Sequence, residues 1–299
     1  MKVLIIGGGI SPERDISLKS SRVIYEAAIS AGHICEFYDW DGSVDWLNSN
    51  AKQFDVVLPV LHGKGGEDGG IQKILESLRV SYLGSDSESS QLCFDKVKTR
   101  DILQKHGINI ASGKYVTLKE YISHSLFNKP HVLKPNGGGS SIDTFIYSDT
   151  PQQEMSIIEE VFSVHKKMLL EEYIEGNEIT VPVLDGKDLP VTEIIPPEGG
   201  TFDLENKYNG QSQELIPPKN INIDIQNKAK LIASDVHEIM GCKHLSRTDM
   251  IVREDKIYVL EVNTMPGMTD QSLFPKSALY AGMSMLEFVD YLIKITIEN

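Results

Sequence analysis

The sequence predicts a protein of several domains in the α/β and α+β classes, with a parallel α/β domain at its N-terminal end. Its 299 residues are enough for two or three compact domains. Short strands and helices alternate at the start of the chain, which is typical of a parallel sheet. Later strand candidates are separated by longer polar or glycine-rich loops. We therefore expect domains at 1–90, 91–173 and 174–299.

The first domain is predicted from apolar runs followed by turn residues. Residues 3–6 form a buried strand that ends at three glycines, and helical spacing of apolar and small residues follows until Gly32. Pro12 stands where a dinucleotide-binding turn needs its third glycine, and it fixes φ and lacks an amide donor. This weakens the alternative of a nicotinamide-dependent oxidoreductase. Further strands are expected at 34–38, 55–60 and 81–83, and a further helix at 71–78.

The remaining elements are predicted in the same way. We expect strands at 114–117, 131–134, 168–171 and 179–184, helices at 95–106, 152–164, 225–240 and 285–297, and a hairpin over 246–262. A long polar loop is expected over 196–217.

Composition limits the function. A net charge of −14 argues against general binding to nucleic acids or anionic membranes. Cys35, Cys93 and Cys242 are scattered without a CxxC pair, which suits a reducing compartment. The sequence has neither a signal-peptide pattern nor an apolar stretch of about 20 residues. We expect a cytoplasmic protein.

Two glycine-rich loops follow predicted strands. The first, His62 to Gly70, lies where open α/β sheets bind ligands, beyond the carboxyl end of a parallel strand. The second, Lys134 to Ser141, combines a lysine, three glycines and two hydroxyls, a set that suits phosphate. It is not a Walker loop, because no G-K-[ST] follows the glycines.

The predicted hairpin carries candidate metal ligands. A three-residue turn at 253–255 would pair Asp249 with Val259, so that Glu261 lies diagonally across from Asp249 on the same face. Arg247 and Asn263 share that face because side chains alternate along a strand. Two carboxylates and an amide are hard oxygen donors of the kind that Mg²⁺ binds.

These motifs, in this order, resemble the D-alanine–D-alanine ligases of the ATP-grasp superfamily. The resemblance covers nearly the whole chain. It rests on residues 11–17, the His62 loop with Gln72, Asp95-Lys96, residues 134–141, Glu171, Glu178, Lys207-Tyr208, Arg247-x-Asp249, residues 261–269 and Ser272-Leu273.

The resemblance implies a three-domain ATP-grasp architecture and ATP-dependent ligation of two D-alanines, through an acyl phosphate, for peptidoglycan precursor synthesis. It implies ATP and two Mg²⁺ ions, with Mn²⁺ as a substitute, and a homodimer. The implied catalytic residues are Glu13, Ser140, Tyr208, Arg247 and Gly267, and the substrate-binding residues are His62, Ser272 and Leu273. The implied nucleotide-binding residues are Lys96, Lys134, Glu171, Glu178 and Lys207, and the metal ligands are Asp249, Glu261 and Asn263.

Two alternatives remain within this resemblance. D-Lactate or D-serine could replace D-alanine as the second substrate, although Tyr208 favours D-alanine, because ester-forming relatives usually lack this tyrosine. A catalytically silent ATP-binding protein of the same fold is the alternative from another class. Asp143 departs from the family pattern, which has glycine there, and places a negative charge near the phosphate loop.

Overall fold

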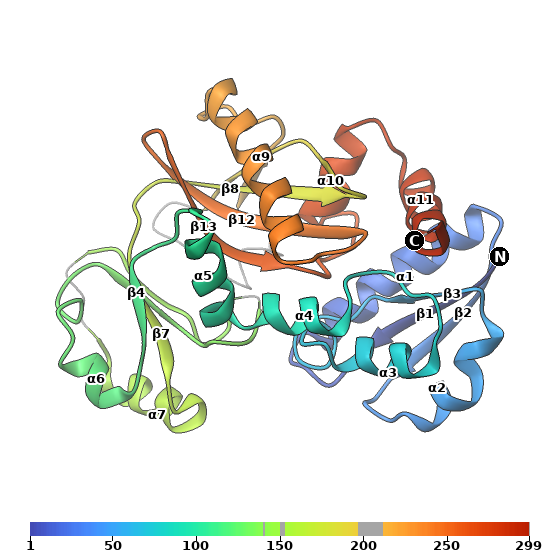
Figure 1. Cartoon of the computed structure of the whole chain (residues 1–299), viewed down its shortest axis with the longest axis horizontal. Coiled ribbons are helices and arrows are strands. Elements are labelled where there is room, and N and C mark those ends of the chain that lie inside the picture. The colour runs from blue at the N-terminus through green and yellow to red at the C-terminus, as the bar shows by residue number, and fades with distance from the viewer. Residues whose placement is uncertain (140, 150–152, 197–211, 299) are drawn as a thin grey trace.

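A computed structural model describes residues 1–139, 141–149, 153–196 and 212–298 of the chain (Figure 1). It contains three β-sheets in chain order, with helices around them. The predicted combination of a parallel N-terminal sheet with mixed α+β regions is confirmed.

The N-terminal sheet is parallel, with strand order β2-β1-β3. Its elements are β1 (Lys2–Gly8), α1 (Arg14–Ser30), β2 (Ile34–Trp40), α2 (Asp45–Asn50), a 3-10 turn (Ala51–Gln53), β3 (Val56–Pro59) and α3 (Gly70–Leu78). Six of the seven residues of β1 are buried, because both faces of this central strand are covered. The strand predicted at 81–83 is wrong: only Tyr82 forms an isolated bridge, to Val57, before the chain turns at Gly84.

The second sheet is antiparallel, with order β4-β7-β5-β6. It follows α4 (Ser87–Phe94) and α5 (Lys96–Lys105), and comprises β4 (Gly113–Val116), α6 (Leu118–Ile122), β5 (His131–Lys134), β6 (Phe145–Tyr147), α7 (Met155–His165) and β7 (Met168–Glu172). Strand β5, an inner strand of this sheet, ends at Lys134, so the glycine-rich loop begins at the carboxyl end of that strand. Helix α5 packs its Leu103 against the core of the third sheet, not of this one.

The third sheet has the order β11-β10-β8-β12-β13, with β9 paired to β8. Its elements are β8 (Asn177–Leu184), β9 (Lys187–Asp188), β10 (Thr192–Ile195), β11 (Gln213–Leu215), α9 (Ile223–Ile239), β12 (Leu245–Arg253), β13 (Lys256–Asn263), α10 (Leu273–Tyr280) and α11 (Met285–Glu298). Helix α11 returns to the N-terminal sheet and packs beside α1, where Phe288 and Leu292 share a core with Val3 and Ile24 (Figure 1).

The predicted turn of the β12–β13 hairpin is wrong by one residue. The turn contains only Glu254 and Asp255, so Val252 lies opposite Ile257 and not Lys256. Glu254 has φ +57°, a left-handed conformation that such a short turn requires.

A register shift beside Asp249 restores the predicted face. Met250 lies opposite Val259, whereas Asp249 lies directly opposite Glu261, so β13 contributes the additional residue Leu260 between these pairs. A shift of one residue moves a side chain to the other face of a sheet. The bulge, which the sequence did not reveal, therefore brings both carboxylates to the same face.

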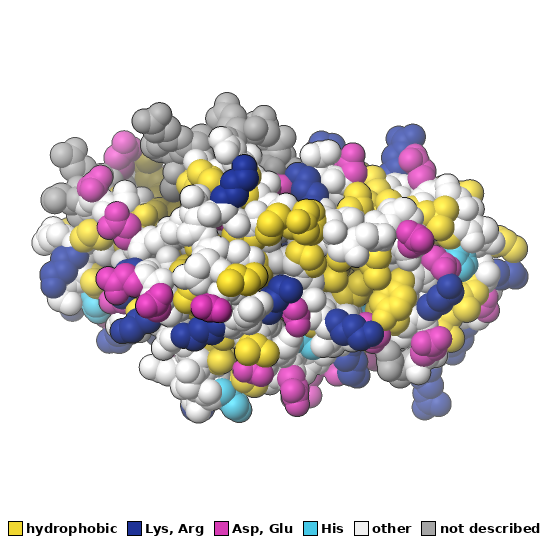
Figure 2. Space-filling model, turned by 90° about the horizontal axis from the view of Figure 1, so that it is seen from above, with side chains coloured by type: hydrophobic (Ala, Val, Ile, Leu, Met, Phe, Trp, Pro, Cys, Tyr) yellow, Lys and Arg dark blue, Asp and Glu magenta, His cyan; other side chains and the backbone are white. Residues whose placement is uncertain are grey.

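Surface charge is distributed, and no described helix resembles a membrane span. Acidic, basic and apolar side chains are interspersed on the face viewed from above in Figure 2. Within the described ranges, none of the helices combines the length and apolarity needed to cross a membrane.

Candidate active site

Two adjoining cavities contain most of the described candidate residues. The larger, of about 350 Å³, lies between the second and third sheets and is lined by Lys96, Lys134, Glu171, Glu178 and Asp249, among others. The smaller, of about 70 Å³, is lined by Glu13, His62, Arg247, Asn263, Gly267, Ser272 and Leu273, among others. Glu261 lines both cavities. Ser140, Lys207 and Tyr208 lie outside the described residues.

The β12–β13 hairpin contributes lining residues to both cavities. Asp249 is buried, and its carboxylate accepts bonds from Arg247 Nε (2.8 Å) and Nη2 (2.7 Å). Asn263 Nδ2 donates to Asp249 Oδ2 (3.1 Å), and Thr180 Oγ1 donates to Oδ1 (2.5 Å). Two parallel bonds from a guanidinium hold a carboxylate firmly and fix its orientation. Sequence reasoning missed Thr180, which lies on the neighbouring strand β8.

The hairpin oxygens fit a magnesium ion by their chemistry. Asp249 and Glu261 are directly opposite on adjacent strands, and Asn263 also reaches Asp249. Among the described residues, no group of three or more His, Cys, Asp or Glu side chains could hold a metal ion. Two carboxylates with an amide are nevertheless the kind of set that Mg²⁺ uses when substrate phosphates complete its coordination.

The lysines of the larger cavity are already paired with carboxylates. Lys134 Nζ lies 2.6 Å from Glu171 Oε2, and Arg100 binds the other oxygen of Glu171. Lys96, the first residue of α5, donates to the Gly138 carbonyl (2.7 Å) and lies 3.3 Å from Glu261 Oε2. These ion pairs hold both lysines at the 134–141 loop; the Lys134–Glu171 pair is buried, whereas Lys96 and Glu261 are partly exposed. Arg100 was not among the sequence candidates.

Asp143 does not line the larger cavity. Its neighbours Ile142 and Thr144 line the cavity, whereas the Asp143 carboxylate lies 2.7 Å from His165 Nε2, at the end of α7. Asp143 has φ +55°, a conformation that glycine adopts with less strain.

Glu13 lies at the junction of three segments. It is the N-cap residue of α1, and its amide donates to Ser11 Oγ (3.1 Å), which in turn donates to the His62 carbonyl (2.7 Å). A Cβ atom at Gly63, where φ is +68°, would clash with the Glu13 carboxylate. The absence of a side chain at Gly63 therefore leaves room for this carboxylate in the smaller cavity.

His62 is buried and neutral. Burial, together with the nearby Arg247 charge, lowers the pKa of His62 to about 4, although the contact with the Met265 carbonyl acts in the opposite direction. Nδ1 lies 3.2 Å from the Met265 carbonyl, and Nε2 lies 3.2 Å from Ser20 Oγ. The carbonyl can only accept, so the proton is on Nδ1 and Ser20 donates to Nε2. His62 therefore joins α1 to the segment after β13.

Glu67 and Glu214 line the smaller cavity, although the sequence assigned them no role. Burial and, to a smaller extent, the negative charges of Glu13 and Glu261 together raise the pKa of Glu67 to about 8. Glu67 Oε2 accepts the Gly63 amide (2.6 Å). Its place in the same glycine-rich loop as His62 was the signal that could have identified it.

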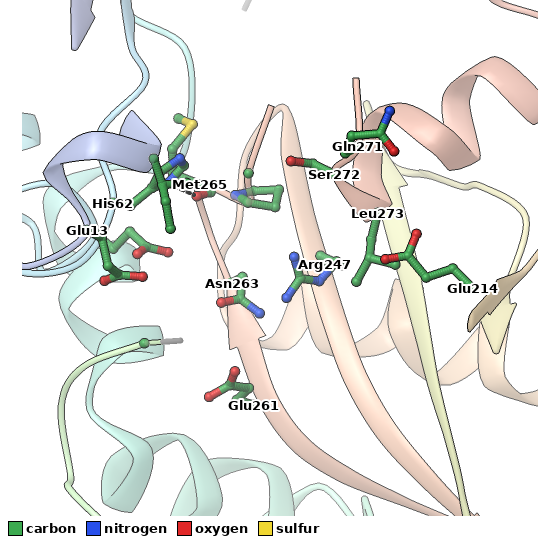
Figure 3. Close-up of a pocket in the computed structure, with 15 residues that line it drawn as sticks. Glu13, His62, Glu214, Arg247, Glu261, Asn263, Met265, Gln271, Ser272 and Leu273 are labelled. Carbon is green, nitrogen blue, oxygen red and sulfur yellow. Dashed lines mark hydrogen bonds between the residues drawn. The ribbon is translucent and has the colours of Figure 1, made fainter. Parts of the chain in front are cut away.

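Figure 3 shows how the smaller cavity is arranged around Arg247. Glu13 and His62 lie on one side of the guanidinium, Leu273 and Glu214 lie on the other, and Ser272 lies above it in this view. Ser272 is the N-cap residue of α10, and its Oγ accepts the Thr269 amide (3.1 Å). The Glu13 carboxylate thus lies at one end of the cavity, and the start of α10 lies toward the other end.

Comparisons with known proteins identify this arrangement. The family model described as D-ala D-ala ligase C-terminus matches residues 102–294, and the D-ala D-ala ligase N-terminus model matches 46–85. The chain belongs to the D-alanine–D-alanine ligase family. The prediction made from the motifs is therefore confirmed.

Individual relatives agree over their full length. The D-alanine–D-alanine ligase of Pseudothermotoga lettingae is 37% identical over 99% of this chain and 100% of its own. One from Clostridium botulinum is 38% identical over 98% of this chain and 97% of its own. The crystal structure of the Bacillus anthracis ligase complexed with ATP matches with a TM-score of 0.85 and 30% identity, over 100% of this chain and 98% of that one.

Proposed function

We propose that this chain joins two D-alanines into D-alanyl-D-alanine, forming an acyl phosphate and releasing ADP, in the synthesis of peptidoglycan precursors. Membership of the family supports the reaction. The observation that supports the assignment of its parts is that Glu261 and the β12–β13 hairpin line two cavities at once. A phosphate bound in one can thus approach a carboxylate bound in the other.

ATP occupies the larger cavity in this proposal. Lys96 and Lys134 face its phosphates, and Glu171 and Glu178 face the adenosine. The Bacillus anthracis structure that matches over the whole chain was solved with ATP, which supports nucleotide use. Because Glu171 already binds Lys134 and Arg100, part of its role is to hold Lys134 in place.

Asp249, Glu261 and Asn263 would hold Mg²⁺ or Mn²⁺, two ions according to the family resemblance. Bound there, the metal would offset the negative charge of the phosphates. Lys96 and Lys134 add to this charge compensation, so that an anionic carboxylate can approach the γ-phosphate. Arg247, Asn263 and Thr180 all donate to Asp249 in this structure, so at least one of these bonds has to be released when the metal is held.

The two D-alanines occupy the smaller cavity. Glu13 receives the ammonium group of the first, with neutral His62 nearby. Arg247 and the Gly267 amide face the oxyanion that forms when the second amine attacks. Ser272 and Leu273 receive the carboxylate of the second D-alanine at the start of α10.

The roles of Ser140, Lys207 and Tyr208 stay predictions. So do the domain boundaries at 1–90, 91–173 and 174–299, the homodimer, the cytoplasmic location and the lack of nucleic-acid or membrane binding.

Product identification tests the proposal. The protein is incubated with ATP, Mg²⁺ and D-alanine at neutral pH, and again with excess D-lactate or D-serine, and the products are separated by mass spectrometry. We expect D-alanyl-D-alanine in each case, with ADP release that depends on D-alanine. A predominant ester or mixed dipeptide would contradict D-alanine as the second substrate. ATP binding without ADP release would indicate a silent member of the family.

A further inference from the structure

An ion pair involves one of the residues that line the smaller cavity, Glu214. Lys276 Nζ, on α10, lies 2.6 Å from Glu214 Oε2, on β11. The Glu214 side chain is only 12% exposed and the Lys276 side chain 30%. Glu214 also lines the cavity, and Figure 3 shows its carboxylate beside Leu273. This partial burial makes electrostatic interactions stronger than at an open surface.

The pair lies at the end of the cavity that the second D-alanine would occupy. Lys276 is one helical turn after Ser272, and its amide donates to the Ser272 carbonyl (3.1 Å). A substrate carboxylate at Ser272 and Leu273 is therefore close to the negative charge of Glu214. That charge would repel it unless a cation compensated for it.

We propose that Lys276 neutralises Glu214 so that this end of the cavity accepts a substrate carboxylate, and that the pair thereby sets the affinity for the second amino acid. The inference rests on the proposed function for the position of the second D-alanine. It adds two binding determinants, on β11 and α10, that act on one of the two substrates.

The fold around the pair has other sources of stability. Backbone pairing with β10 holds β11, through Glu193 with Leu215 and Ile195 with Gln213. Helix α10 is held by Phe274 and Ala278, which belong to the large N-terminal core. Losing the charge of either partner therefore alters the cavity more than it alters the fold.

The test uses opposite electrostatic effects of two single substitutions. Lys276→Met leaves Glu214 uncompensated, so KM for the second D-alanine should rise about tenfold. Glu214→Gln leaves the lysine cation unpaired near the carboxylate, so this KM should fall about two- to threefold. The double variant E214Q/K276M removes both charges and should lie within about twofold of the unchanged protein, because Coulomb interactions with the pair vanish together.

Initial rates are measured with D-alanine varied over a range wide enough to separate the two binding events. The KM values for ATP and for the first D-alanine, and kcat, should change little. Lys294→Met is the matched control, because Lys294 lies on α11, is 57% exposed and pairs with Asp290. Thermal unfolding of each variant verifies the fold.

The inference would be overturned if both single variants raised the KM for the second D-alanine and the double variant showed the sum of their effects. It would also be overturned if the KM for the first D-alanine changed as much as the KM for the second. A further arm uses D-alaninamide as the second substrate, which has the amine but no carboxylate. The difference between K276M and the unchanged protein should disappear with it, and a persisting difference would overturn the inference. Failure of the proposed function is recognised separately, because the unchanged protein would then form no D-alanyl-D-alanine.

Discussion

The two cavities of the site differ in their basic side chains. In the larger one, Lys134 is paired with Glu171 and Lys96 with Glu261, and Glu172, Glu178 and Asp249 line it as well. Within the part of the chain that the structure describes, the smaller one is lined by the carboxyl groups of Glu13, Glu67, Glu214 and Glu261, and by one arginine, Arg247. That arginine already binds Asp249.

The contrast indicates what each cavity accepts. A phosphate entering the larger cavity competes with carboxylates for lysines that are already in place, so binding exchanges ion pairs. Among the described residues, the smaller cavity is lined by four carboxyl groups and no lysine, which favours ligands with an ammonium group. The raised pKa of Glu67, about 8, is a consequence of this crowding together with burial.

The largest expected effect comes from the hairpin that the cavities share. Asp249→Ala removes one carboxylate of the proposed metal set and the anchor of Arg247. We expect turnover to be abolished and the dependence of nucleotide binding on Mg²⁺ to be lost, because too few hard oxygens remain. Steady-state rates and calorimetric titration with an ATP analogue at varied Mg²⁺ measure both effects.

Arg247→Ala is the comparison variant. It leaves the metal donors in place and removes the proposed oxyanion donor, so kcat should fall by roughly 10²–10³ while the Mg²⁺ dependence persists. Near-normal turnover would show that the guanidinium only orients Asp249. If this variant also lost the Mg²⁺ dependence, Arg247 would be needed for metal binding as well, and the two substitutions would not distinguish the roles of the two cavities.

The second prediction concerns the neutral histidine of the smaller cavity. The pKa of His62 is about 4 in the folded protein and about 6.5 when exposed, so the unfolded chain binds more protons between these values. Stability should therefore fall as pH decreases from about 6.5 to 4, by up to about 1.4 kcal/mol per pH unit for this group. His62→Asn should reduce this acid sensitivity in thermal unfolding measured across that range.

His237→Asn is the matched control, because burial also lowers the pKa of His237 to about 4, beside Ser246 and outside the smaller cavity. Both variants should lose acid sensitivity, but only His62→Asn should weaken D-alanine binding. An unchanged acid slope in His62→Asn would show that folding does not lower the pKa of His62, which would contradict the neutral histidine described for the smaller cavity between about pH 4 and 6.5.

Most of this architecture followed from local sequence patterns. The apolar run before Gly7 predicted β1, and alternation along 246–262 predicted the hairpin that carries Asp249 and Glu261. Short helices such as α4 and α10 were missed, because their sequences do not show a long apolar period.

Contacts between distant residues could not be predicted in this way. The pair Glu214–Lys276 joins residues 62 positions apart, and Thr180 reaches Asp249 across 69. The bulge beside Asp249 likewise depends on how two strands fit together. Such features follow from tertiary packing, which determines which charges meet, whereas a motif shows only which charges are available.

The smallest expected effect concerns how the segment around Asp143, beside the larger cavity, is held in place. Asp143 lies just after the 134–141 loop and takes a left-handed conformation, and its contact with His165 holds this segment against α7. Both side chains are partly exposed, so the contact contributes a modest free energy, and His165→Ala should raise KM for ATP by about two- to fivefold without changing kcat.

Glycine at this position makes the test decisive. Asp143→Gly adopts the same φ without strain and has no carboxylate to bind, so its KM for ATP should stay within about twofold of the unchanged protein. In that background His165→Ala should have no further effect, whereas Asp143→Ala loses the contact and keeps the strain, and should have the highest KM. His106→Ala, at the exposed end of α5, is the control for removing a surface histidine. If His165→Ala had the same effect in the unchanged protein and in the Asp143→Gly variant, this segment would not depend on the contact between the two side chains. The contacts of Lys96 and Lys134 would then be the ones that hold the loop beside the larger cavity.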